Sequence, residues 1–145
     1  MAQTPIRVGI NGFGRIGRNF FRAVNATNAP IEIVAVNDLG SIKTMAHLLK
    51  YDSVLGILPN EIKALEDGIS VDGKVLKVLQ FRDPKDLPWK SLGVDVVIES
   101  TGFFTERDKA AAHLEAGAPL VIVSAPSTGA DATFVYGVNH NDFDR

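Results

Sequence analysis

Residues 6–17 read Ile-Arg-Val-Gly-Ile-Asn-Gly-Phe-Gly-Arg-Ile-Gly, an apolar run followed by glycines in the spacing G-x-G-x-x-G. The apolar run predicts a buried strand over 6–11, and the residues behind it predict a helix from about 14 to 25. Glycines between a strand and a helix let the main chain turn sharply, let a pyrophosphate approach the backbone, and let the helix pack closely on the strand. The helix N-terminus adds free N–H groups and the positive end of the helix dipole. The segment therefore predicts a turn that binds the phosphates of a dinucleotide, the alternative being a tight turn without a ligand.

An acidic residue stands where a dinucleotide site needs one. A second apolar run, 31–36, ends in Asn37 and Asp38, which places a carboxylate about 20 residues beyond the last glycine. A carboxylate at that distance can accept hydrogen bonds from the hydroxyls of an adenosine ribose. It would also repel a 2′-phosphate, so the pattern favours NAD over NADP. The alternative interpretation is a solvated acid at the end of a strand.

Strands and helices alternate along much of the chain, which is the rhythm of a parallel sheet. The hydrophobic pattern predicts further strands at 31–37, 94–99, 120–124 and 133–136, and helices at 41–51 and 106–116. In the middle of the chain three short strands, at 61–65, 69–71 and 74–79, break this rhythm and predict a small antiparallel insertion. The predicted fold class is therefore α/β, a Rossmann-type, doubly wound and mostly parallel sheet with that insertion.

Composition narrows the classes of function. The 145 residues are 46% hydrophobic and 22% charged, which is ordinary for one soluble globular domain. A net charge of −2 gives no broad positive field, so no nucleic-acid partner is expected. We expect no membrane partner and a cytoplasmic location, because the chain has no long apolar segment and no signal-like N-terminus. The absence of cysteine rules out disulfides, thiolate metal ligands and a thiol nucleophile within these residues.

Small polar residues follow two of the predicted strands. The segments 99–102 (Glu-Ser-Thr-Gly) and 124–126 (Ser-Ala-Pro) should lie at the same sheet edge as the glycine turn, although each also fits an ordinary loop. Arg82, judged by composition alone, is a surface charge. Ser124 and Ser127 have no recognisable base or nucleophile elbow, so a hydrolase triad is not expected.

The histidines do not predict a metal site. His47, His113 and His140 share no spacing of metal ligands, and we assign no metal. His113 falls in the alanine-rich segment predicted to be a helix, where we expect a solvated imidazole.

Seven ordered blocks of the sequence, spread along the full length of the chain, resemble phosphorylating glyceraldehyde-3-phosphate dehydrogenase. They are Ile10-Asn11-Gly12-Phe13-Gly14-Arg15-Ile16-Gly17-Arg18, Asn37-Asp38, His47-Leu48-Leu49-Lys50-Tyr51-Asp52-Ser53, Arg82-Asp83-Pro84, Glu99-Ser100-Thr101-Gly102, Ser124-Ala125-Pro126 and Gly137-Val138-Asn139-His140. The resemblance implies NAD as the cofactor.

The same resemblance implies roles for particular residues. The backbone N–H groups of Arg15 and Ile16 would hold the pyrophosphate, and Asp38 the hydroxyls of the adenosine ribose. Arg82 would lie on the adenine side, which overrides its interpretation as a surface charge. Ser124 would stand near the nicotinamide half, Phe104 would flank the adenine ring, and Thr101 and Gly102 would border the adenosine. The full set of predicted cofactor-binding residues is Asn11, Gly12, Gly14, Arg15, Ile16, Gly17, Asp38, Arg82, Thr101, Gly102, Phe104 and Ser124.

The resemblance further implies that residues 1–145 are an NAD-binding domain and that the catalytic domain is absent from this chain. In the family the nucleophile lies in a Ser-Cys-Thr-Thr-Asn segment a short way past the block represented here by 139–144. We therefore expect no catalytic residue here and no catalysis by this chain alone. The parent protein would be a glycolytic homotetramer in which a cysteine attacks the aldehyde, hydride passes to NAD, and phosphate splits the thioester.

Two alternatives remain open at this point. Erythrose-4-phosphate dehydrogenase is a close relative whose substrate choice rests largely on the absent half. A stand-alone nucleotide-binding or regulatory module is the alternative from a different class. A Ser-Cys-Thr-Thr-Asn segment encoded immediately downstream would favour the enzyme, whereas a natural stop codon after Arg145 would favour the module.

Overall fold

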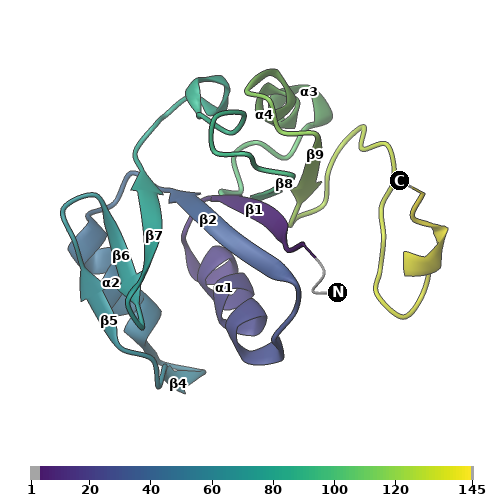
Figure 1. Ribbon diagram of the computed structural model, residues 1–145. Helices are drawn as coiled ribbons and strands as arrows, with labels where there is room; N and C mark the ends of the chain where they lie inside the picture. Colours follow the sequence, from purple (N-terminus) through teal and green to yellow (C-terminus); the bar gives the residue numbers. More distant parts are fainter. Residues whose placement is uncertain (1–3, 145) are drawn as a thin grey trace.

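Seven strands form the main sheet of the computed structural model, which describes residues 4–144. They are β1 (Ile6–Asn11), β2 (Ile31–Asn37), β5 (Ile62–Ala64), β6 (Gly68–Val71), β7 (Lys74–Leu79), β8 (Val96–Glu99) and β9 (Leu120–Val123). Their order is β5-β6-β7-β2-β1-β8-β9 (Figure 1). Strands β7, β2, β1, β8 and β9 pair in parallel, whereas β5, β6 and β7 pair antiparallel. The predicted doubly wound sheet with an antiparallel insertion is confirmed.

The chain reverses its direction of winding at β1. It runs from β1 to β2 and on to β7 on one side, while β8 and β9 continue the sheet on the other side of β1. In an open α/β sheet, the crevice outside the carboxyl ends of the strands at such a switch point is where ligands bind. The topology therefore directs attention to the carboxyl ends of β1 and β8.

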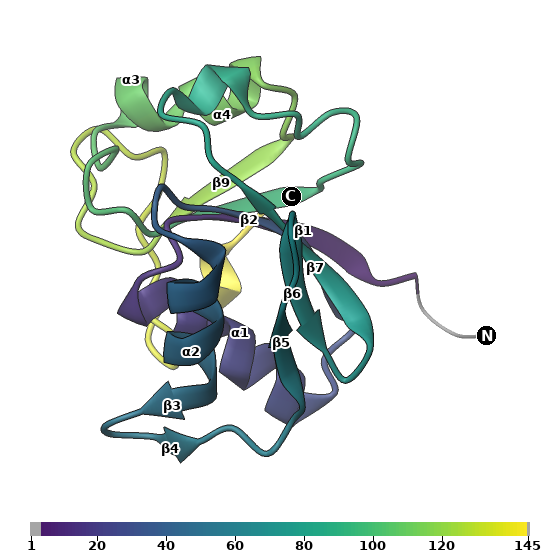
Figure 2. The same ribbon diagram turned by 90° about the vertical axis from the view of Figure 1, so that its left-hand side faces the viewer.

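Helices cover both faces of the sheet (Figures 1 and 2). On one face, α1 (Arg15–Thr27) and α2 (Ile42–Lys50) bury a core that includes Phe21 and Leu49. On the other face, the short helix η1 (Pro84–Asp86), α3 (Arg107–Ala110) and α4 (Ala112–Glu115) lie over a second core centred on Trp89. β8 contributes Ile98 to the first core and Val97 to the second. It is therefore covered on both faces, which favours a nearly continuous apolar run.

Two hairpins connect neighbouring antiparallel strands. β6 and β7 are joined through Asp72 and Gly73, which both have positive φ, at 49° and 83°, as a type I′ hairpin turn requires. A second hairpin, β3 (Tyr51–Asp52) with β4 (Gly56–Ile57), follows α2 and was not among the predicted elements. No helix within residues 4–144 has both the length and the apolar character needed to cross a bilayer.

The structure corrects two predicted elements. The helix expected over 106–116 is divided into the one-turn helices α3 and α4, because bonds such as Leu114 N–H to Ala111 C=O tighten the chain between them. The strand expected over 133–136 is wrong. The side chain of Asn139 accepts the N–H of Val135 (2.7 Å) and donates to the C=O of Thr133 (3.0 Å), taking up groups that a strand ladder would use. The chain then ends its described part with the short helix η2 (His140–Asp142).

Candidate functional site

The glycine turn follows β1 and enters α1 as predicted. Gly12 has a φ of +91°, and a Cβ placed on it would lie 2.7 Å from the backbone nitrogen of Thr101. A Cβ on Gly17 would overlap the carbonyl oxygen of Gly12. These two glycines are therefore required by the fold, because backbone from the turn and from the β8 loop passes directly over them.

Gly14 is different, because nothing lies within 4 Å of a Cβ placed on it. It occupies the N-cap of α1 with φ −74° and ψ −159°, values that other residues adopt, and it has no side chain to cap the helix. The first N–H groups of a helix have no carbonyl partner within that helix. Open space thus lies over a helix N-terminus whose amides, those of Arg15 and Ile16 among them, can hold an anion.

Asp38 ties the end of β2 to this turn. Its Oδ2 accepts the backbone N–H of Phe13 (2.9 Å), and its Oδ1 accepts the backbone N–H of Gly40 (2.9 Å). The carboxylate is therefore oriented by the glycine turn itself. Because Phe13 directly precedes Gly14, this bond holds Asp38 against the glycine turn.

The loop after β8 packs against the same turn. The hydroxyl of Ser100 donates to the carbonyl oxygen of Gly12 (2.7 Å), and Thr101 follows it. Gly102 is exposed and has a φ of +77°. The structure therefore brings Ser100 and Thr101 to the glycine turn, at the carboxyl edge of neighbouring parallel strands.

The remaining predicted residues lie at the same edge but with less defined roles. Ser124 follows β9, and its hydroxyl donates to the carbonyl oxygen of Glu99 (3.1 Å). Arg82 is exposed after β7, and Phe104 is half-buried in the loop after β8. Asn11 is 2% exposed, and its side chain is directed into the protein interior rather than toward solvent. The assignment of these residues to a cofactor stays a prediction.

Arg15 uses its side chain within the protein. Its guanidinium contacts Oδ2 of Asp52 (3.1 Å), and Oδ1 of Asp52 accepts the backbone N–H groups of Val54 and Leu55 (both 2.8 Å). The bonds from Leu55 and Val54, followed by the nearby charge of Arg15, lower the pKa of Asp52 to about 2. This leaves the main-chain N–H of Arg15, not its side chain, as the group available to a phosphate.

Two residues beneath this edge were misjudged or overlooked at the level of sequence. His113 is fully buried, so its expected solvated position is wrong. Its Nε2 lies 2.7 Å from Oε2 of Glu99, which is 1% exposed and also accepts from Asn11 and Thr101. Burial by itself raises the pKa of Glu99, but hydrogen bonds from His113, Thr101 and Asn11 outweigh it and hold that pKa below its ordinary value. The position of Glu99 at the end of an apolar strand was the signal available in the sequence. It did not identify His113 as the partner of Glu99.

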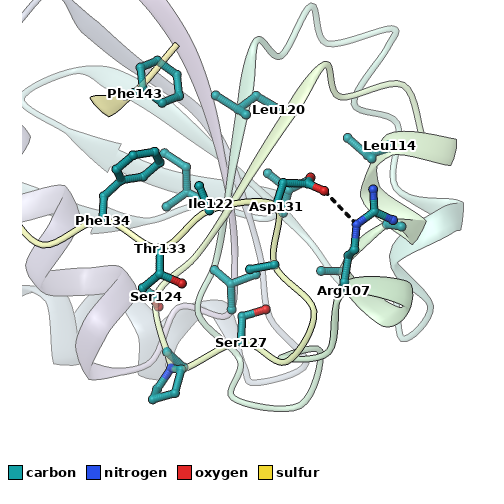
Figure 3. A pocket seen from close by; sticks show the side chains of 18 of the residues that line it. Arg107, Leu114, Leu120, Ile122, Ser124, Ser127, Asp131, Thr133, Phe134 and Phe143 are labelled. Carbon is teal, nitrogen blue, oxygen red and sulfur yellow. Dashed lines mark hydrogen bonds and ion pairs between the residues drawn. The ribbon is translucent and has the colours of Figure 1, made fainter. Parts of the chain in front are cut away.

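A large groove lies elsewhere. A hollow of about 1080 Å³ lies between β9, the α3–α4 region and the C-terminal residues. Figure 3 shows side chains that line it. Apolar side chains that line it include Leu114, Leu120, Ile122, Phe134 and Phe143. Of the predicted cofactor-binding residues only Ser124 lines this groove. The groove is therefore distinct from the space over the glycine turn.

Known sequences match nearly the whole of this chain. The family described as "Glyceraldehyde 3-phosphate dehydrogenase, NAD binding domain" matches residues 6–107. The glyceraldehyde-3-phosphate dehydrogenase of Streptomyces coelicolor is 59% identical over 139 residues, which are 96% of this chain and 41% of that protein. That of Xanthobacter flavus is 57% identical over 136 residues, 93% of this chain and 41% of that protein. Glyceraldehyde-3-phosphate dehydrogenase 1 of Bacillus cereus is 54% identical over 138 residues, 95% of this chain and 41% of that protein. The chain thus spans about two fifths of the length of these relatives.

Proposed function

Because the chain belongs to the family of NAD-binding domains of glyceraldehyde-3-phosphate dehydrogenase, we propose that it binds NAD across the glycine turn and the carboxyl ends of β1, β2 and β8. The observation that carries this proposal is that the glycines of the turn have different surroundings. Gly12 and Gly17 are needed by the fold, whereas Gly14 leaves open space over the N-terminus of α1. A pyrophosphate fits such a cradle.

Different residues of the chain would contact different parts of the cofactor. The main-chain N–H groups of Arg15 and Ile16 hold the pyrophosphate, and Asp38 accepts from the adenosine ribose hydroxyls. Arg82 and Phe104 lie on the adenine side. Thr101 and Gly102 border the adenosine, and Ser124 stands toward the nicotinamide half. This assignment draws its support from the position of these residues at one edge of the sheet.

The chemistry of the whole protein is a second part of the proposal. When bound, NAD supplies the acceptor for hydride in the phosphorylating oxidation of glyceraldehyde 3-phosphate. This chain holds and orients the cofactor. The thiol nucleophile belongs to a catalytic domain outside residues 1–145, because these residues contain no cysteine. The chain alone would therefore not catalyse the reaction. A homotetramer and a cytoplasmic location for the whole protein are further predictions from the family resemblance.

The test is a pair of glycine substitutions followed by calorimetric titration with NAD. Gly14→Ala meets no protein atom, so we expect unchanged thermal stability and NAD binding at least about tenfold weaker, equivalent to about 1.4 kcal/mol. Gly12→Ala is the matched control. It forces a Cβ at positive φ against the Thr101 backbone, so we expect a loss of stability of at least about 1–2 kcal/mol. If Gly14→Ala binds NAD as tightly as the unchanged chain, the phosphates do not lie over α1.

A further inference from the structure

A row of buried, hydrogen-bonded side chains crosses the sheet beneath the proposed site. Its members are Asn37, Asn11, Glu99, His113 and Trp89, none of which is more than 6% exposed. Asn37, Asn11 and Glu99 are the last residues of the adjacent strands β2, β1 and β8. The row therefore runs perpendicular to the strands, along their carboxyl ends, and continues to the helical layer that covers one face of the sheet.

The contacts are continuous from one end to the other. The amide of Asn37 exchanges hydrogen bonds with the main chain of Phe81, at 2.8 and 2.9 Å, and donates to Oδ1 of Asn11 at 2.8 Å. Nδ2 of Asn11 donates to Oε2 of Glu99 at 2.6 Å. His113 Nε2 lies 2.7 Å from the same oxygen, and Nε1 of Trp89 lies 3.0 Å from His113 Nδ1.

The direction of these bonds follows from the chemistry of the groups. An indole N–H only donates, so Nδ1 of His113 must accept from Trp89, and the ring proton resides on Nε2. His113 therefore donates to Glu99. Glu99 accepts in addition from the backbone N–H (2.9 Å) and the hydroxyl (2.5 Å) of Thr101 through Oε1. One ionised carboxylate thus joins His113 and Asn11 on one oxygen to Thr101 on the other.

Each strand-end member of the row is joined to part of the proposed nucleotide site, either along the chain or by a hydrogen bond. Asn11 is followed by Gly12, and Asn37 is followed by Asp38. Glu99 bonds directly to Thr101, whose backbone nitrogen faces the place where Gly12 has no Cβ. Changing the position of Glu99 therefore changes the separation of the glycine turn and the β8 loop.

We propose that His113 is a positioning residue of the nucleotide site, acting through Glu99 on Thr101 and on the glycine turn. This inference rests on the NAD binding proposed above. Trp89 fixes the tautomer and the ring orientation of His113 from one side, and Glu99 receives its proton on the other. Because His113 itself is fully buried, it would act on a nucleotide only through these neighbours.

Two substitutions separate the two bonds of His113. Glutamine is one bond longer than asparagine, so the amide nitrogen in His113→Gln reaches the place of Nε2 and can still donate to Glu99. His113→Asn reaches only the place of Nδ1, where its oxygen can still accept from Trp89. Trp89 is the sole tryptophan of the chain, so its fluorescence reports which bond each variant keeps. We expect a changed emission in His113→Gln and an unchanged one in His113→Asn.

The measurements are titration with ADP and hydrogen exchange of the Thr101 amide by NMR, on the chain of 145 residues. We expect His113→Gln to bind ADP within about twofold of the unchanged chain, and His113→Asn to bind about tenfold more weakly, equivalent to about 1.4 kcal/mol. The Thr101 amide should exchange faster in His113→Asn than in His113→Gln without any nucleotide. A purely structural role for His113 would lower thermal stability in both variants without separating them in either measurement.

The outcomes distinguish this inference from the proposed function. Equal ADP affinities and equal Thr101 exchange in the two variants would overturn the positioning role while leaving nucleotide binding intact. If the unchanged chain does not bind ADP but Thr101 exchange still separates the variants, the nucleotide function is wrong and the link from His113 to Thr101 is supported. If the two variants differ both in ADP affinity and in Thr101 exchange, the positioning role and nucleotide binding are both supported.

Discussion

Asp38 carries two tasks that substitutions can separate. It accepts the N–H groups of Phe13 and Gly40 within the protein, and in the proposed complex it also accepts from the ribose hydroxyls. Asp38→Ala should weaken NAD binding by roughly tenfold or more, because a hydrogen bond to a charged group contributes about 1.5–3 kcal/mol. The affinity for NADP should fall less or even rise, because the repulsion between Asp38 and the 2′-phosphate disappears. The measurement is the ratio of NAD to NADP dissociation constants.

Asp38→Asn is the matched control for that prediction. Its amide oxygen can still accept the Phe13 N–H, so the turn keeps one of its two ties while the negative charge is removed. We expect the preference for NAD over NADP to become smaller in both variants. An unchanged ratio in both would remove Asp38 from the ribose site.

Asp52 provides a prediction about acid stability. Its pKa of about 2 lies below the ordinary 3.8, so its bonds to Leu55, Val54 and Arg15 stabilise the fold fully above about pH 4. That contribution is lost as the pH falls from about 4 to about 2, where the folded carboxylate becomes protonated. Asp52→Asn should therefore be less stable than the unchanged chain at pH 6, with a difference that shrinks toward pH 2. Urea unfolding at several pH values measures it, and a difference independent of pH would contradict the role of the charge.

Among the elements, β1 is constrained by its contact with Trp89. A Cβ on Gly9 would lie 2.6–3.0 Å from three atoms of the indole ring, which is fully buried. Neither the central strand nor the ring can move freely, so Gly9→Ala should cost about 1–3 kcal/mol of unfolding free energy. Chemical denaturation followed by Trp89 fluorescence measures this cost. Gly14→Ala is the control, since it adds the same methyl group into open space, and equal stability of the two variants would contradict this packing.

The elements that the sequence predicted well are those whose signal is local. Local sequence alone determines the conformation of the apolar run of β1 and of the glycine turn behind it. The wrong strand at 133–136 looked equally apolar, but side-chain bonds from Asn139 compete with a ladder there. The burial of His113 was not predictable either, because Glu99 and Trp89 come from different elements and meet it only in the folded sheet. The candidate site was thus predictable at its turn and acid, but not in the buried row beneath them.

At the scale of the whole molecule, the apolar groove beside β9 leaves several large apolar side chains exposed. Ile122, Phe134 and Phe143 line it and are 40–48% exposed. Contiguous exposed apolar surface, particularly beside an edge strand, favours association with another polypeptide. The function proposed above would place a further domain and neighbouring subunits over apolar surface of this kind.

We therefore expect the chain of 145 residues to self-associate as its concentration rises. Ile122→Lys places a charge on the exposed face of β9 and should weaken that association by about tenfold or more, equivalent to about 1.4 kcal/mol. Val75→Lys is the matched control, since Val75 is 61% exposed on β7, away from the groove. Sedimentation velocity over a range of concentrations, with binding of an apolar dye, measures both effects. A monodisperse monomer with little dye binding would contradict this expectation and would favour a self-sufficient nucleotide-binding module, whereas equal weakening by both lysines would place the contact elsewhere on the surface.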